Sequence, residues 1–132
     1  MINSPIHDLL IRIKNAYLAR RKEVNDIPSS TFKIAVLTLL KKYGFVKSFD
    51  EYADGNKKFV NVSLAYKGVR HEDVPVIKFY SKPSKRWYVA KDETKPVAGG
   101  RGIGIISTNQ GLMAAHEAKK LGIGGELIAE IY

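Results

Sequence analysis

The sequence predicts an α+β fold, in which an N-terminal α-β-α-β-β subdomain packs against a mainly antiparallel β C-terminal subdomain with one short helix. Apolar residues recur at helical spacing in two segments of the first half, and they alternate with polar residues at strand spacing in both halves. Between the halves, residues 67–75 combine glycine, histidine, acids and proline with little periodicity. We therefore expect subdomains at residues 1–67 and 76–132, joined by a linker at residues 68–75.

The first half contains the two longest predicted helices. A helix is expected over about residues 5–19, because Ile6, Leu9 and Ile13 fall on one helical face. A second helix is expected to begin after the Pro-Ser-Ser sequence at residues 28–30 and to stop at Gly44. Strands are expected at residues 24–27, 45–49 and 60–66, with a turn at residues 54–56.

The second half is predicted to be mainly β structure. Strand-like runs occupy residues 76–80, 86–90 and 103–107, and a last strand is expected over residues 126–132. One short helix is expected at about residues 114–121, ending at Gly122.

Positive charge is the clearest functional signal in the composition. Lysine and arginine number 22 against 13 acidic residues, which gives a net charge of +9 and a pI near 9.7. This balance is typical of proteins that bind nucleic acid. The absence of cysteine excludes disulfides and thiolate metal sites. The sequence shows neither a signal-peptide pattern nor a long uncharged apolar run, so we expect a cytoplasmic protein that does not enter a membrane.

Motifs for enzyme chemistry are incomplete in this sequence. The glycines of GGRGIG, residues 99–104, precede a strand, whereas a dinucleotide fingerprint follows a strand and opens a helix. A turn or a close backbone approach is the better interpretation. His7, His71 and His116 do not have the spacing of metal ligands, and Ser107 lacks the flanking glycines of a nucleophile elbow.

The segment YSKPSKRWYVAK, residues 80–91, interleaves basic and aromatic side chains. Cations such as Lys82, Lys85 and Arg86 can neutralise phosphates, and aromatic faces can stack on bases or ribose. The alternative is a hairpin whose aromatic rings are core residues and whose lysines are solvated. We expect both to hold, with some rings buried and one available to RNA.

The segment IISTNQG, residues 105–111, ends an apolar strand in small hydrogen-bonding side chains. Ser107, Thr108 and Asn109 can satisfy backbone groups of a local turn, which is a common role for these residue types. The same side chains offer donors and acceptors that suit ribose 2′-hydroxyls and base edges in the shallow minor groove of RNA. The residues alone leave both interpretations open.

Further segments carry a resemblance: HDLLIRIKNAYLAR, IPSSTFKIAVLTLLKKYGFVKSF, SKPSKRWYV and GRGIGIISTNQGLMAAHEAKKLGIGGELIAEIY. Together they resemble the small-subunit ribosomal protein S-eight family of bacterial type, over nearly the whole chain and in the same order. The resemblance implies two subdomains and a primary rRNA-binding protein, which docks on an irregular helix in the central domain of small-subunit rRNA and supports its assembly. Some members also bind a similar structure on their own mRNA and repress its translation.

The resemblance also implies which residues contact RNA. They are the loop residues Ser107, Thr108 and Asn109, the carboxylate of Glu126, the hairpin residues Tyr88, Lys82 and Arg86, and Ser30 and Lys33 near the start of the second helix. We add Lys85 to this set because it is one of the basic side chains of the hairpin. The sequence departs from the family pattern at Asn109 for serine, Ala114 for a capping threonine, Ser84 for glycine and Lys119 for arginine.

We therefore expect a non-enzymatic structural constituent of the small ribosomal subunit, located on the cytoplasmic ribosome. Its expected partners are small-subunit rRNA and neighbouring ribosomal proteins, with its own mRNA as a further candidate. We expect no cofactor and no metal, and a monomer when the chain is free. The alternatives are a free translational repressor of its own mRNA, a basic protein-interaction module, and a nucleotide-binding or hydrolytic enzyme, which the misplaced glycines disfavour.

Overall fold

The computed structural model describes residues 3–66, 74–82, 84–91, 93 and 96–132. The chain divides into two compact units, one formed by Asp8–Pro75 and the other by Met1–His7 together with Val76–Tyr132. Helices and antiparallel sheets in this order confirm the predicted α+β class. Most of the expected linker, residues 68–75, lies outside the described residues, so the bounds of the two subdomains stay a prediction.

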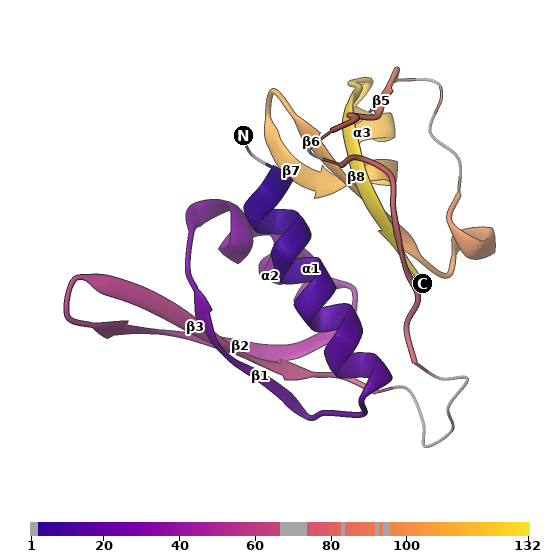
Figure 1. Cartoon of the computed structure of the whole chain (residues 1–132). Helices are drawn as coiled ribbons and strands as arrows, with labels where there is room; N and C mark the ends of the chain where they lie inside the picture. Colours follow the sequence, from indigo (N-terminus) through magenta and orange to yellow (C-terminus); the bar gives the residue numbers. More distant parts are fainter. Residues whose placement is uncertain (1–2, 67–73, 83, 92, 94–95) are drawn as a thin grey trace. The chain divides into compact units, whose positions relative to one another are not determined.

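The unit Asp8–Pro75 contains two helices and an antiparallel sheet of order β1-β3-β2 (Figure 1). Its elements are α1 (Asn3–Leu18), of which the part from Asp8 onward belongs to this unit, β1 (Glu23–Pro28), α2 (Thr31–Lys42), β2 (Val46–Asp54) and β3 (Lys57–Leu64). The element order agrees with the prediction, but β2 runs to Asp54, well beyond the predicted end at residue 49. The reason is that its polar C-terminal half pairs with β3 as far as the turn at Gly55, where φ is +63°.

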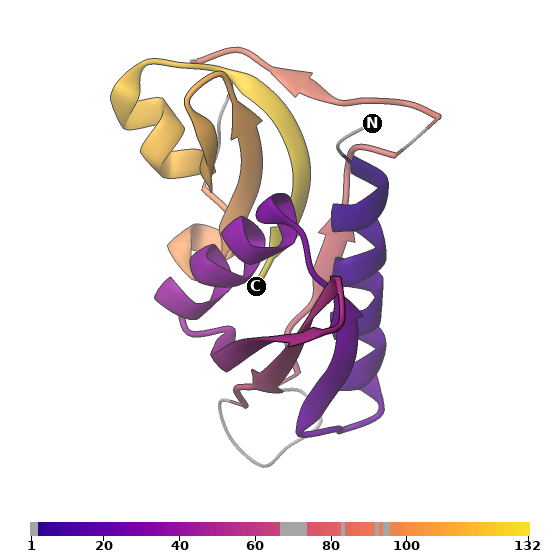
Figure 2. The ribbon, with the colours of Figure 1, turned by 90° about the vertical axis from the view of Figure 1, so that its left-hand side faces the viewer.

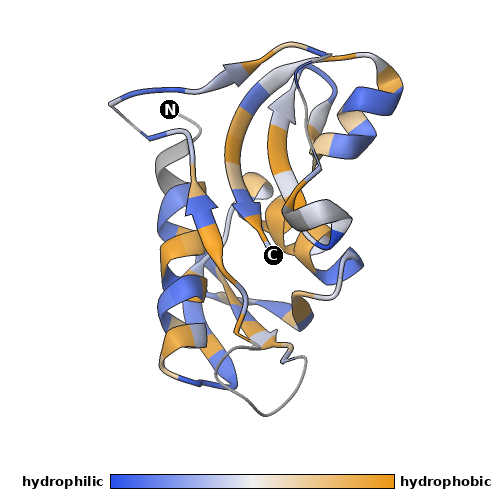
Figure 3. Cartoon of the chain, turned by 90° about the vertical axis from the view of Figure 1, so that its right-hand side faces the viewer, coloured by the Kyte–Doolittle hydropathy of each residue, from blue (hydrophilic) through white to orange (hydrophobic). Residues whose placement is uncertain are grey.

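The core of this unit lies on one face of its sheet. Val60, Val62 and Leu64 of β3 are buried, whereas the alternating positions between them are partly exposed. This alternation indicates that the helices cover one face only, as Figure 1 shows. Hydrophobic and hydrophilic residues alternate along α1 in Figure 3, which is the banding of an amphipathic helix.

The ends of α2 follow from the residues that flank it. Ser30 is extended and its side-chain oxygen accepts a hydrogen bond from the Lys33 amide at 3.2 Å, which satisfies a donor that the helix leaves free. Lys41 and Lys42 occupy the last turn, where positive charge suits the helix dipole. Gly44 follows with a φ of +83°, a conformation that favours glycine. The predicted start and stop of this helix are therefore confirmed.

The second unit is built around the last strand, β8. Its elements are β4 (Ile77–Phe79), β5 (Tyr88–Val89), the short 3-10 helix η2 (Ala98–Gly100), β6 (Ile103–Thr108), β7 (Gly111–Ala114), α3 (Ala115–Leu121) and β8 (Gly125–Ile131). β8 pairs antiparallel with β4, β5 and β6, and β6 pairs with β7 (Figure 2). At the other end of the chain, the His7 ring lies 4.4 Å from the ring of Phe79, which explains why residues before Asp8 group with this unit.

β7 is an element that the sequence did not predict. Its few residues pair with β6 across the turn at residues 109–110. Gly111, the first residue of β7, follows this turn with a φ of +108°. The helix α3 starts at Ala115, and its N-cap residue Ala114 makes no side-chain capping bond. Alanine has no side-chain oxygen, so the helix starts without that bond. Gly122 ends α3 in the left-handed conformation, as predicted.

None of the described helices is both long enough and apolar enough to cross a membrane.

A buried tyrosine ties α1 to the segment between α2 and β2. Tyr17 is fully buried, its hydroxyl donates to the carbonyl oxygen of Phe45, and its ring meets that of Tyr66 edge-on at 5.4 Å. Burial, with a smaller contribution from Tyr66, raises the pKa of the Tyr17 phenol well above its ordinary value of 10.0. The folded protein therefore holds this proton more tightly than the unfolded chain does.

Replacing Tyr17 by phenylalanine should lower the free energy of unfolding at neutral pH by about 1 kcal/mol, because one buried hydrogen bond is lost. The wild-type protein should also lose stability as the pH rises above about 10, since only the unfolded chain then releases the Tyr17 proton. Chemical denaturation at a series of pH values would measure both effects. Tyr17→Phe should show a shallower alkaline decline, and Tyr88→Phe, which changes an exposed ring, is the matched control. Parallel declines in wild type and Tyr17→Phe would show that Tyr17 does not hold its proton more tightly in the folded state.

Candidate nucleic-acid interface

The strand pairings of the second unit place several predicted site residues in one row. Glu126 at the start of β8 pairs with Tyr88 of β5 on one side and with Ser107 of β6 on the other. Residues directly opposite each other in antiparallel strands project from the same face of a sheet. Tyr88, Glu126 and Ser107 therefore share one face, although they are far apart in the sequence.

Glycines before Glu126 allow the strands to approach. A Cβ atom at Gly124 would lie 2.4 Å from the carbonyl oxygen of Val89, and one at Gly125 would lie 2.3 Å from that of Ser107. Such contacts are too short for any side chain, so the backbones of β5 and β6 can reach β8 only if these positions are glycine. The Gly-Gly-Glu sequence is thus a structural requirement of the row.

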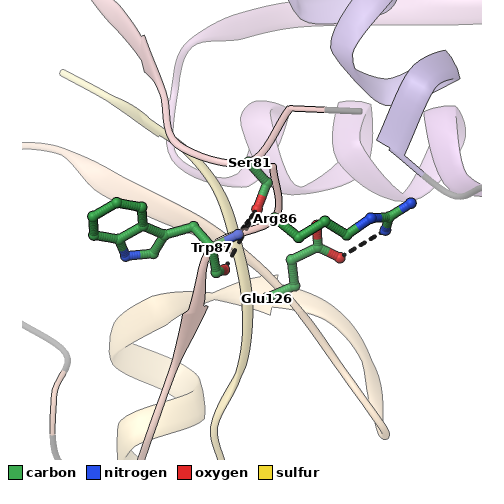
Figure 4. Close-up of polar contacts among 4 residues, drawn as sticks. All are labelled: Ser81, Arg86, Trp87 and Glu126. Atoms are coloured by element: carbon green, nitrogen blue, oxygen red, sulfur yellow. Dashed lines mark hydrogen bonds and ion pairs between the residues drawn. The ribbon is translucent and has the colours of Figure 1, made fainter. Parts of the chain in front are cut away.

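The Glu126 carboxylate lies largely inside the protein. The residue is 7% exposed, and one of its oxygens accepts a hydrogen bond and ion pair from the Arg86 guanidinium at 3.3 Å (Figure 4). A buried carboxylate is stable only when it is paired or well hydrogen-bonded. The first role of Glu126 is therefore to orient Arg86. No sequence pattern indicated this pairing between residues 40 positions apart.

The hairpin before β5 is closed by backbone bonds and by a buried serine. The backbone groups of Lys82 and Lys85 exchange hydrogen bonds of 2.8 and 3.0 Å. The Ser81 hydroxyl accepts a bond from the Trp87 amide at 2.8 Å (Figure 4). Ser84 lies in this turn and is exposed. Lys82 and Lys85 are both exposed to solvent.

The loop after β6 divides its polar side chains between two uses. The Thr108 hydroxyl accepts a bond from the Gln110 amide at 3.1 Å and donates to the Gly111 carbonyl at 2.8 Å, so it shapes the turn itself. Ser107 is partly exposed and Asn109 is exposed. Within the described residues, neither of these two side chains makes a hydrogen bond to the rest of the chain. The turn interpretation therefore holds for Thr108, while Ser107 and Asn109 can meet a ligand.

The remaining predicted site residues, Ser30 and Lys33, belong to the other compact unit. The Ser30 hydroxyl caps α2, and the Lys33 ammonium donates to the Pro28 carbonyl at 2.7 Å. Partial burial lowers the pKa of Lys33, the Arg12 charge lowers it further, and Asp8 opposes the shift. Both side chains thus have local structural partners. The helix start predicted after residues 28–30 is consistent with the role of Ser30, whereas the bond from Lys33 to Pro28 was not indicated by the sequence.

The motifs considered for enzyme chemistry have structural explanations. The glycines of residues 99–104 lead into β6, and a Cβ at Gly104 would meet the Ala115 side chain at 2.9 Å. The interpretation as a close approach is therefore confirmed. His71 lies outside the described residues. Among the residues that the structure does describe, no group of histidine and acidic side chains could hold a metal ion.

Comparison with known proteins assigns the chain to the ribosomal proteins. A family model described as "Ribosomal protein S8" matches residues 4–132. The small ribosomal subunit protein uS8 of Clostridium kluyveri is 41% identical over 132 residues, covering 100% of this chain and 99% of that protein. The protein of the same name from Caldanaerobacter subterraneus subsp. tengcongensis is 42% identical with the same coverage. The chain therefore belongs to the ribosomal protein S8 family, which is not a class of enzymes.

Replacing Gly125 by alanine should separate β6 from the start of β8, because the added methyl group would collide with the Ser107 carbonyl. Overpacking of this kind lowers the free energy of unfolding by roughly 1–3 kcal/mol. Amide hydrogen exchange at Ser107 and Glu126 should accelerate more than elsewhere in the protein. Gly55→Ala is the control for destabilisation without a collision. Its site has open space, its positive φ strains an alanine, and it lies in the other unit. Unchanged exchange at Ser107 in Gly125→Ala would refute the close-packing argument.

Proposed function

We propose that the row formed by Tyr88, Glu126 and Ser107, with Arg86 beside it, docks on an irregular helix in the central domain of small-subunit rRNA. The chain is a structural constituent of the small ribosomal subunit, with small-subunit rRNA and ribosomal proteins as partners on the cytoplasmic ribosome. One observation carries the proposal: an exposed aromatic ring, an oriented guanidinium and a partly exposed hydroxyl project from one face of one sheet.

The basic hairpin would supply most of the affinity. Lys82 and Lys85 are exposed at its turn, and the whole chain carries a net charge of +9. Each ammonium group that neutralises a phosphate releases condensed counterions, which makes binding tighter at low salt and weaker at high salt. This contribution depends on the RNA backbone and carries no sequence information.

The loop and the tyrosine would supply shape recognition. Ser107 and Asn109 offer donors and acceptors to 2′-hydroxyls and base edges of a distorted helix, and Thr108 holds the loop in place. Tyr88 is 68% exposed, so its ring can stack on a base or a ribose. Glu126 acts through Arg86, whose guanidinium it pairs with at 3.3 Å.

The start of α2 is a second candidate contact with the RNA backbone. Ser30 fixes the first turn of the helix, and helix N-terminal amides favour phosphate. Lys33 adds positive charge near this end. Binding of a similar structure on its own mRNA would use the same residues of the second unit, and comparing rRNA with mRNA affinity would separate the two roles.

Lysine and serine substitutions should affect RNA binding in different ways. Lys85→Ala should reduce the slope of log affinity against log salt concentration by roughly 1, because one phosphate contact is lost. Ser107→Ala should weaken binding by about 1 kcal/mol at every salt concentration, as expected for one lost hydrogen bond. Titration of the rRNA central-domain fragment over a range of salt concentrations would measure both.

Lys57→Ala, which removes an exposed charge from the other compact unit, is the control for a general change in net charge. The salt slope should change less in this variant than in Lys85→Ala. The proposed division of roles is wrong if Lys85→Ala and Ser107→Ala change the salt slope equally.

A further inference from the structure

A pocket of about 280 Å³ opens on the face of the sheet opposite Tyr88 and Glu126. Its lining includes the rings of Tyr80 and Trp87, the side chain of Leu127, and the carboxylate residues Glu93 and Glu130. All of these residues belong to the same compact unit. An aromatic pocket with acidic groups is unexpected on a chain whose net charge is +9.

Strand alternation separates this pocket from the proposed RNA face. Trp87 and Tyr88 are consecutive, so their side chains project from opposite faces of the sheet. Figure 4 shows the Trp87 ring pointing away from the pair formed by Arg86 and Glu126. Leu127 follows Glu126 and pairs with Ile106, which packs against α3. The pocket is therefore on the α3 side of the sheet.

The two carboxylates are held in place but keep capacity for a ligand. Glu93 accepts a hydrogen bond from the Ala90 amide at 2.7 Å, and Glu130 accepts one from the Tyr80 hydroxyl at 2.9 Å. An ionised carboxylate has about four acceptor positions, so each of these groups can accept further bonds. Fixed acceptors of this kind favour a cation and repel phosphate groups.

The aromatic rings suit a flat cation. Trp87 is 45% exposed, and its ring meets that of Tyr80 at 5.6 Å with an interplanar angle of 67°. Lys78 already places its ammonium 5.1 Å from the centre of the Tyr80 ring. Its interaction with Tyr80, and to a smaller extent Glu130, raises the pKa of Lys78. The edge of the pocket therefore stabilises positive charge, as cation–π contacts do.

We propose that this pocket binds an arginine side chain of a neighbouring protein. A guanidinium can stack on the indole of Trp87 while donating to Glu93 and Glu130, and an ammonium cannot make such planar, forked contacts. The carboxylates disfavour RNA at this site. One sheet would then present a cationic face to RNA and an acidic, aromatic pocket to protein. The pocket does not depend on the RNA proposal, because it is carried by different side chains.

The single tryptophan of the chain makes the pocket directly observable. The full chain, labelled with ¹⁵N, would be titrated with the capped peptide Gly-Arg-Gly while the indole N–H signal of Trp87 is followed by NMR. The matched probe carries citrulline in place of arginine, which keeps the shape and removes the charge. We expect saturable shifts with a Kd of about 1 mM for the arginine peptide, in the range of one anchored side chain, and binding about tenfold weaker for the citrulline peptide.

Variants of the pocket complete the test. The double variant with Glu93→Gln and Glu130→Gln should bind the arginine peptide about tenfold more weakly, whereas Asp50→Asn in β2 should bind as the wild type does. An amide spectrum that matches the wild type outside the pocket, in each free variant, would show that the fold is kept. The proposal is overturned if the arginine peptide causes no saturable shift, if citrulline binds equally well, or if the rRNA fragment shifts the Trp87 signal and competes with the peptide.

Discussion

The ion pair between Arg86 and Glu126 is the interaction on which the arrangement of the second unit depends. Glu126 is nearly buried, so its charge requires a partner, and the guanidinium of Arg86 comes from the hairpin that leads into β5. This contact holds the hairpin against β8 at the point where Gly124 and Gly125 let the neighbouring strands approach. The orientation of Tyr88 and Trp87 follows from the backbone pairing of this segment with β8, which the ion pair accompanies.

β8 gives the sheet two chemically different faces. On one face, the row containing Tyr88 and Ser107 includes Glu126, which pairs with the Arg86 guanidinium, and this arrangement suits an anionic ligand. On the other, Trp87 and Glu130 line an acidic pocket, which suits a cationic one. Strand alternation places Trp87 and Tyr88 on opposite faces, and the irregularity in the pairing of β8 with β6 between Leu127 and Ala129 brings Glu130 to the face of Leu127 and away from that of Glu126. The backbone bonds of Lys82 with Lys85 and the buried Ser81 keep the register at the hairpin.

Much of the fold could be predicted because local physics decided it. The cap at Ser30, the stop at Gly44 and the alternation along β3 are signals contained within a few residues. β7 and the second half of β2 could not be predicted, because their polar or short sequences become strands only through pairing with β6 and β3.

The prediction of the site was limited in the same way. Sequence and resemblance nominated Tyr88, Ser107 and the basic hairpin as RNA contacts. They did not decide which of the loop side chains shapes the turn, and they did not indicate that Glu126 is buried.

The most direct test is a double-mutant cycle in RNA affinity for Glu126→Gln and Arg86→Met, each shown to be folded. If Glu126 acts by orienting Arg86, Glu126→Gln should weaken RNA binding in the wild-type background and have almost no effect once Arg86 is methionine. Equal losses in both backgrounds would show that the Glu126 carboxylate contacts RNA independently, which would contradict its role as the residue that positions Arg86.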